Sequence, residues 1–195
     1  MPSLDRESVG ATRGDASATL ATARGLADSF DELYRAHVAQ VERYLVRRVG
    51  EVLAEELTAQ TFEAAWAGRD RFDPEQGPFR GWVFGIATNL VSAHYRAEER
   101  ALRARSRHGL SIAACEDVAV RVVGSVDAKG ATNKLAAAIA KLSHEDRSVL
   151  LLCTVEELSY AEVAAALSIP VGTVRSRLSR VRDRLAVAVG LDRGC

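Results

Sequence analysis

The chain has 195 residues, 48% hydrophobic and 27% charged, as expected of a soluble globular protein with one large or two small domains. Basic and acidic residues are equal at 26 each, so any strongly charged surface must be local and balanced elsewhere. Three widely spaced cysteines form no C-x-x-C pair or His/Cys cluster, and no apolar run approaches the roughly 20 residues that span a bilayer. We therefore expect a reduced cytoplasmic protein with no cofactor, no metal and no membrane insertion.

Residues 1–26 are mostly small and polar, a composition that predicts a flexible extension. A helix is expected from Asp28 to a stop at Gly50. Its large apolar residues fall on one side and are Phe30, Leu33, Tyr34, Val38, Val41 and Leu45. This helix therefore has one face to bury.

A second helix is expected from Val52 to Trp66, and its first part is strongly acidic. Four glutamates and no basic residue lie between Glu51 and Glu63. Such a face is either simply solvated or a site for a basic protein surface. The acidic segment by itself does not decide between the two.

A polar loop with glycine and proline, residues 68–78, leads to the clearest amphipathic pattern in the chain. From Phe79 onward apolar residues recur three and four apart, which predicts a helix at the centre of a helical bundle. His94 continues this row, and we expect a packed core histidine because no acid or nucleophile is spaced to use it as a base. From Arg96 to Arg107 five arginines face two acids, which makes a cationic patch.

Residues 108–133 include a stretch of small polar residues that predicts a flexible linker. Beyond it, Ser159 and Glu162 form an S-x-x-E capping box that marks a helix start. Pro170 cannot continue that helix and suits the first turn of the next one. The break is therefore expected at Ser168. A left-handed backbone conformation at this turn position would favour glycine.

The last helix is strongly basic. Val174, Leu178 and Val181 form one apolar stripe, and five arginines against one acid between Val171 and Leu185 give a net charge of +4. A helix of this kind on a short preceding helix is typical of the helix-turn-helix, whose second helix enters the DNA major groove. The alternative is a C-terminal packing helix with merely solvated arginines. The tight turn and the charge together favour DNA.

Two sets of motifs resemble one known family. The segment IPVGTVRSRLSRVRDRL is similar to the C-terminal promoter-reading domain of bacterial sigma factors of the extracytoplasmic-function (ECF) group. A second set of motifs is similar to the N-terminal polymerase-binding domain of the same family. These motifs are Gln60-Thr61-Phe62, Trp66, RFDPEQGPFRGW and IATNL. The resemblance covers roughly Phe30–Arg107 and Leu135–Val189.

The resemblance implies an all-α protein of two small helical domains joined by a flexible linker, the C-terminal one containing a helix-turn-helix. The expected divisions are an extension 1–26, a polymerase-binding and minus-ten domain 27–107, a linker 108–133, a minus-thirty-five domain 134–190 and a tail 191–195.

Site residues follow from the resemblance and from charge. Contacts to core RNA polymerase are expected from Glu55, Glu56, Gln60 and Thr61. Contacts to DNA are expected from Phe79, Arg80, Asn89 and Arg96 for the minus-ten element, and from Thr173, Arg175, Ser176, Arg177, Ser179 and Arg180 for the minus-thirty-five element. The family often has Arg where Thr88 stands and Asp or Asn where Ala93 stands, which predicts an unusual or weakened minus-ten preference.

The implied function is that of a sigma factor, which binds core RNA polymerase and directs it to promoter DNA, here in a stress or envelope response. An anti-sigma factor is the further partner expected. The alternative is an autonomous helix-turn-helix regulator whose N-terminal helical domain dimerises or binds a ligand. An enzyme is not expected, because the sequence offers no paired carboxylates, nucleophile elbow, phosphate-cradling glycine loop or metal cluster.

Overall fold

The computed structural model describes residues 25–107 and 129–190, and these ranges contain helices and no strand. The expected all-α fold is confirmed. Two short 3-10 helices, η1 (Arg69–Arg71) and η2 (Pro74–Gln76), lie in the segment just before Phe79. The α-helices are α2 (Leu26–Val49), α3 (Glu51–Ala67), α4 (Phe79–Arg107), α5 (Lys129–Ala140), α6 (His144–Thr154), α7 (Tyr160–Leu167) and α8 (Val171–Val189).

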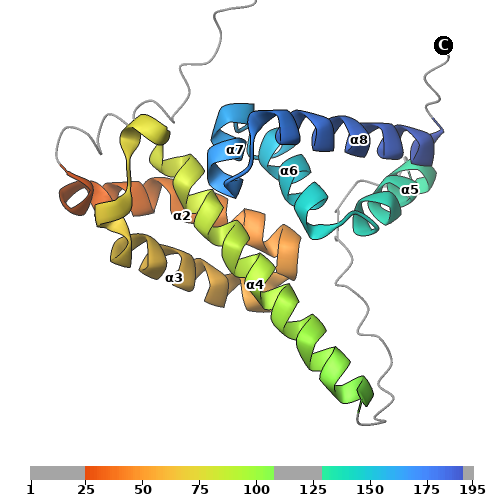
Figure 1. The fold of residues 1–195 in the computed structure, drawn as a ribbon, viewed down its shortest axis with the longest axis horizontal. Helices are drawn as coiled ribbons and strands as arrows, with labels where there is room; N and C mark the ends of the chain where they lie inside the picture. Colours follow the sequence, from red (N-terminus) through yellow and green to blue (C-terminus); the bar gives the residue numbers. More distant parts are fainter. Residues whose placement is uncertain (1–24, 108–128, 191–195) are drawn as a thin grey trace, which may run out of the picture.

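Helices α2, α3 and α4 form the first bundle (Figure 1). Gly50 alone separates α2 from α3, and its φ of 82° lies in the region that favours glycine, which explains why the chain reverses there. Helix α4 crosses the other two, and its C-terminal part projects beyond them. Its fully buried residues are Phe79, Val83, Phe84, Ala87 and Val91. The central position predicted for this helix is therefore confirmed.

The second bundle is built from α5 to α8. The capping box at the start of α7 forms as expected, with the Ser159 hydroxyl accepting from the Glu162 amide and the Glu162 carboxylate accepting from the Ser159 amide. Ser168 ends α7 in the left-handed conformation at φ 53°. The helix-turn-helix is thus present in α7 and α8.

Part of the predicted linker is helical. Helix α5 begins at Lys129, so residues 129–133 continue into a helix rather than belonging to a loop. The rest of that linker, residues 108–128, lies outside the described residues, as do residues 1–24 of the N-terminal extension and the tail 191–195.

The two bundles pack against each other through α4 and α7. Gly85 is the point of closest approach, because a Cβ atom there would lie 2.6 Å from the Ala166 carbonyl oxygen. A second contact lies nearer the end of α2, where the Tyr95 ring stacks on the His144 ring at 3.8 Å and Arg48 donates to the His144 carbonyl at 3.3 Å. The two helical domains are therefore packed against each other in the described residues.

Candidate nucleic-acid interface

The outer face of α8 presents the predicted DNA-reading residues to solvent. Val174, Leu178 and Val181 are buried beneath it, which fixes the rotation of the helix. Of the six residues expected to contact the minus-thirty-five element, Arg175, Ser176, Ser179 and Arg180 are exposed, and Thr173 and Arg177 are partly exposed. Helix α8 runs along the edge of the molecule (Figure 1). Its outer face is therefore open to a duplex.

The two ends of α8 differ in their contacts. Near its C-terminus, Arg184 pairs with Asp146 of α6 at 3.6 Å, which holds that end against the bundle. In the N-terminal half, the Ser176 hydroxyl donates to the Thr173 carbonyl at 3.1 Å and the Arg180 Nε donates to the Ser176 carbonyl at 3.3 Å. Base-reading residues of a recognition helix lie in its N-terminal part, so the predicted set occupies the expected half.

A pocket of about 270 Å³ lies where the loop after α3 meets α4. Phe72 and Trp82 line it with ring centroids 5.2 Å apart, and the exposed Asn89 also lines it. Ala166 of α7 is among the lining residues from the second bundle. A space of this size suits one flat ring better than a drug-sized ligand. Stacking rings beside a polar amide are what an unstacked nucleobase requires.

Two expectations at this site need correction. Phe79 is fully buried in the core and cannot stack on a base. Trp82 packs against the core beside Phe79 and also lines the pocket, and its position just after the polar loop was the available signal. Thr88 is also buried, with its hydroxyl 2.8 Å from that of Tyr44, so its side chain does not reach the surface in this arrangement.

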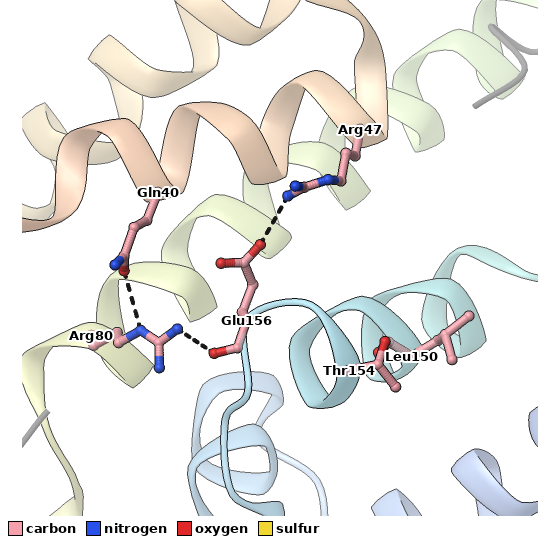
Figure 2. A network of polar contacts seen from close by, with 6 residues as sticks. All are labelled: Gln40, Arg47, Arg80, Leu150, Thr154 and Glu156. Atoms are coloured by element: carbon pink, nitrogen blue, oxygen red, sulfur yellow. Dashed lines mark hydrogen bonds and ion pairs between the residues drawn. The ribbon is translucent and has the colours of Figure 1, made fainter. Parts of the chain in front are cut away.

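The two arginines predicted near the pocket differ. Arg96 is exposed on the projecting part of α4. Arg80 points instead toward α2 and the second bundle, where its Nε donates to Gln40 Oε1 at 3.3 Å and its Nη2 donates to the Glu156 carbonyl (Figure 2). The guanidinium of Arg80 is therefore already occupied within the chain.

The acidic face of α3 is exposed as a set. Glu51, Glu55, Glu56 and Glu63 all lie on the surface. Gln60 belongs to this face and donates to Glu56 Oε1 at 2.9 Å. Thr61 does not, because it is fully buried and its hydroxyl donates to the Leu57 carbonyl at 2.6 Å. A polymerase contact by the Thr61 side chain was therefore the wrong expectation.

The buried histidine is His37 rather than His94. His94 was expected in the core, but its side chain is 31% exposed and lies 3.4 Å from the Glu98 carboxylate. His37 of α2 is the buried one, at 2% exposure and beside the Phe79 ring. Burial lowers the pKa of His37 from 6.5 to about 4. Its spacing of four from both Leu33 and Val41, on the buried stripe of α2, was the sequence signal.

Across residues 25–107 and 129–190, no group of three His, Cys, Asp or Glu side chains is placed to hold a metal ion. Burial raises the pKa of the Cys153 thiol. None of the helices described here is both long and apolar enough to cross a bilayer.

Two family models match the chain in order. The model of sigma-70 region 2 matches residues 33–101, which cover most of the first bundle, and the model of sigma-70 region 4 matches residues 132–185 in the second bundle. The residues that line the pocket and those on the outer face of α8 fall within these matches.

Two sigma factors are similar in sequence to this chain over most of its length. The chain is 35% identical over 158 residues to the ECF RNA polymerase sigma factor SigE of Mycolicibacterium smegmatis, which covers 80% of the chain and 60% of SigE. It is 31% identical over 172 residues to the ECF RNA polymerase sigma factor SigC of Mycobacterium tuberculosis, covering 85% of the chain and 86% of SigC.

Solved structures share the arrangement of helices. CnrH in complex with the cytosolic domain of CnrY superposes with a TM-score of 0.60 at 27% identity, over 91% of this chain and 99% of CnrH. RpoE in complex with the anti-sigma factor NepR from Bartonella quintana gives a TM-score of 0.64 at 24% identity, over 85% and 99%, and supports the fold. With both region models matched in order and relatives matched over most of their length, the chain belongs to the sigma-70 family of RNA polymerase sigma factors, in the ECF group.

Proposed function

We propose that this chain binds core RNA polymerase and directs it to a specific promoter. The observation that carries the proposal is the exposed row of arginine and serine side chains on α8, in a chain whose other bundle carries an exposed acidic helix. The protein acts by binding, as sigma factors do, and has no catalytic step of its own. Its place of work would be the cytoplasm, where the polymerase is.

Each surface has its own task in this proposal. The outer face of α8 reads the minus-thirty-five duplex, with Arg175 as the candidate for a bidentate guanine contact. Once α7 has moved away, the first-bundle side of the pocket, with Trp82 and Asn89, takes an unstacked base of the minus-ten element. The acidic face of α3 docks on a basic surface of the polymerase, because opposite charges steer and orient such a contact.

The bundles must separate if α8 and the pocket are to contact the minus-thirty-five and minus-ten elements at the same time. The minus-ten and minus-thirty-five elements lie about 25 base pairs apart, or about 85 Å at about 3.4 Å per base pair. The longest helix of the packed body, α4 with 29 residues, is only about 43 Å long at about 1.5 Å per residue. The expected linker, without the residues 129–133 that belong to α5, would have to allow this opening.

An anti-sigma factor is the expected regulator. CnrH was solved with the cytosolic domain of CnrY, and RpoE with the anti-sigma factor NepR. A partner that holds the two bundles of this chain together would keep α8 and the pocket from reaching their elements at once.

Run-off transcription with purified core polymerase on genomic fragments tests the proposal. We expect discrete transcripts that depend on the added chain, and co-elution of the chain with core polymerase in gel filtration. The alternative is an autonomous regulator, which would bind an operator by itself and elute separately from the polymerase. That outcome would overturn the proposal.

A further inference from the structure

Residues of both bundles line the pocket of about 270 Å³ while the chain is packed. The first bundle supplies the rings of Phe72 and Trp82 and the amide of Asn89. The second bundle supplies Glu162 of α7 and Ser168, which ends that helix. A small molecule in this pocket would therefore lie between the two bundles.

Glu162 brings a carboxylate to this pocket. A Cβ atom at Gly81 of α4 would lie 3.6 Å from Glu162 Cβ and 3.9 Å from its Cγ. The Glu162 side chain therefore lies against α4, one residue from Trp82 in the chain. Its Oε2 accepts from the Ser159 amide at 2.7 Å in the capping box, and its Oε1 takes no part in that contact.

The charges that line the pocket are one guanidinium, of Arg71, and two carboxylates, of Asp73 and Glu162, a formal net charge of −1. The Asp73 carboxylate is bound within its own loop, where it accepts from the Glu75 amide at 3.0 Å and from Gln76 Nε2 at 2.9 Å. Glu162 is thus the carboxylate with an oxygen to offer a ligand. A pocket of this charge favours a cation over a phosphate or a carboxylate.

The rings of the pocket specify the rest of the ligand. The planes of Phe72 and Trp82 are inclined by 45°, with centroids 5.2 Å apart, and both side chains are partly exposed. Rings in this arrangement pack against a flat apolar group, and tryptophan attracts a cation more strongly than other aromatic side chains do. The side-chain carbonyl of the exposed Asn89 adds a second acceptor for N–H donors.

We propose that the packed chain binds a small aromatic amine, a flat ring with a protonated amino group, in the pocket shared by the two bundles. The ring packs on Phe72 and Trp82, and the ammonium group donates to the Glu162 carboxylate. Because the two halves of the site come from different bundles, binding stabilises the packed arrangement by mass action.

This inference rests on the proposed function as a sigma factor and adds a ligand that controls it. The amine requires Glu162 and therefore the packed chain, whereas the unstacked base enters only after α7 has moved away. Both use Trp82 and Asn89, so the amine and the base exclude each other.

The test is calorimetric titration of the full-length chain with tryptamine as the probe. Indole has the same ring without the amino group, and indole-3-acetate carries the opposite charge. We expect saturable binding of one tryptamine per chain, and at least about tenfold weaker binding of the other two compounds, because each lacks the charged donor for Glu162.

Glu162→Gln removes the charge and keeps the fold. Glutamine at this position of a capping box also accepts from the amide that precedes the helix, so the start of α7 is preserved. We expect about tenfold weaker binding of tryptamine. Glu157→Gln removes the same charge from an exposed residue before α7 that does not line the pocket, and it should leave the affinity unchanged.

Gly85→Leu tests whether the site needs both bundles. A Cβ atom at this position lies 2.6 Å from the Ala166 carbonyl oxygen, so α7 must move away, whereas leucine favours the α4 helix itself. We expect Gly85→Leu to lose tryptamine binding.

Four results would overturn the inference. They are no binding of tryptamine, equal binding of indole-3-acetate, wild-type affinity of Glu162→Gln, and wild-type affinity of Gly85→Leu, which would place the amine on the first bundle alone. The titrations contain neither polymerase nor promoter. Run-off transcription and co-elution with core polymerase, measured without the amine, therefore reveal a failure of the proposed function separately.

Discussion

The outer faces of α3 and α8 carry opposite charge, although both helices bury their inner faces in the same manner. Helix α3 packs Leu57 and Phe62 inward and exposes four glutamates. Helix α8 packs Val174 and Leu178 inward and exposes arginines and serines. Packing explains the inner faces of both helices. The segregated charge outside has no part in the core, so each outer face is free to match a partner of opposite charge.

Reversing the charge of α3 gives the sharpest test of this comparison. Glu55→Lys with Glu56→Lys should weaken binding to core polymerase by about 100-fold or more, because like charges placed across an interface cost several kcal/mol. Both side chains are exposed, so the fold should persist. The measurement is a titration against core polymerase, with a minus-thirty-five duplex as the parallel ligand. Wild-type affinity for polymerase would show that α3 is only a solvated face.

Acid should weaken the bundle that carries α3 through His37. Burial lowers the pKa of His37 from 6.5 to about 4, so the unfolded chain takes up a proton near pH 6.5 and the folded chain only near pH 4. The stability contributed by the neutral histidine is present above pH 6.5 and is lost as the pH falls to about 4. The total loss is about 3 kcal/mol at about 1.4 kcal/mol per pH unit.

Urea unfolding between pH 7 and pH 4 measures this loss. His37→Gln has no group that titrates in this range, so its free energy of unfolding should fall less steeply than that of the wild type. Equal pH dependence of the two proteins would mean that His37 does not control the acid response of this bundle.

Removing one arginine from α8 tests whether the basic outer face of this helix binds DNA. Arg175→Ala should cost about 1 to 3 kcal/mol in binding the minus-thirty-five duplex if Arg175 makes a bidentate base contact. Polymerase binding should not change. Arg35→Ala removes a similar charge from an exposed position on α2 and is the control. An equal loss on specific and random duplexes would assign Arg175 to phosphate rather than to a base.

The smallest expected effect concerns the turn that orients α8. Ser168 adopts φ 53°, a conformation that costs an L-residue about 1 to 2 kcal/mol and costs glycine little. Part of that gain is offset because glycine is more flexible in the unfolded chain. Ser168→Gly should therefore raise the free energy of unfolding by about 0.5 to 1 kcal/mol, measured by urea titration, while DNA affinity stays the same. A decrease would show that the serine side chain stabilises the turn.

Local patterns predicted most of the fold and part of the site. The capping box at Ser159, the stop at Gly50 and the break at Ser168 were readable because each depends on a few neighbouring residues. The exposed faces of α3 and α8 were readable for a similar reason, since charge that cannot be buried must face outward. Errors fell on α4, which is apolar over much of its circumference, so periodicity alone could not tell the core side of Phe79 from the pocket side of Trp82. Two further errors were the burial of Thr61 on α3 and of His37 on α2.

The sequence by itself therefore determined the helices, the helix-turn-helix and the separation of acidic from basic surfaces. Only the tertiary structure decided that the bundles meet and that their closest approach falls at Gly85. It also decided that Arg80 turns away from the pocket to reach Glu156. Helix periods and caps arise from residues within a few positions of one another. The contact between Arg80 and Glu156 joins residues 76 apart in the chain, and such a contact exists only once the helices have been placed.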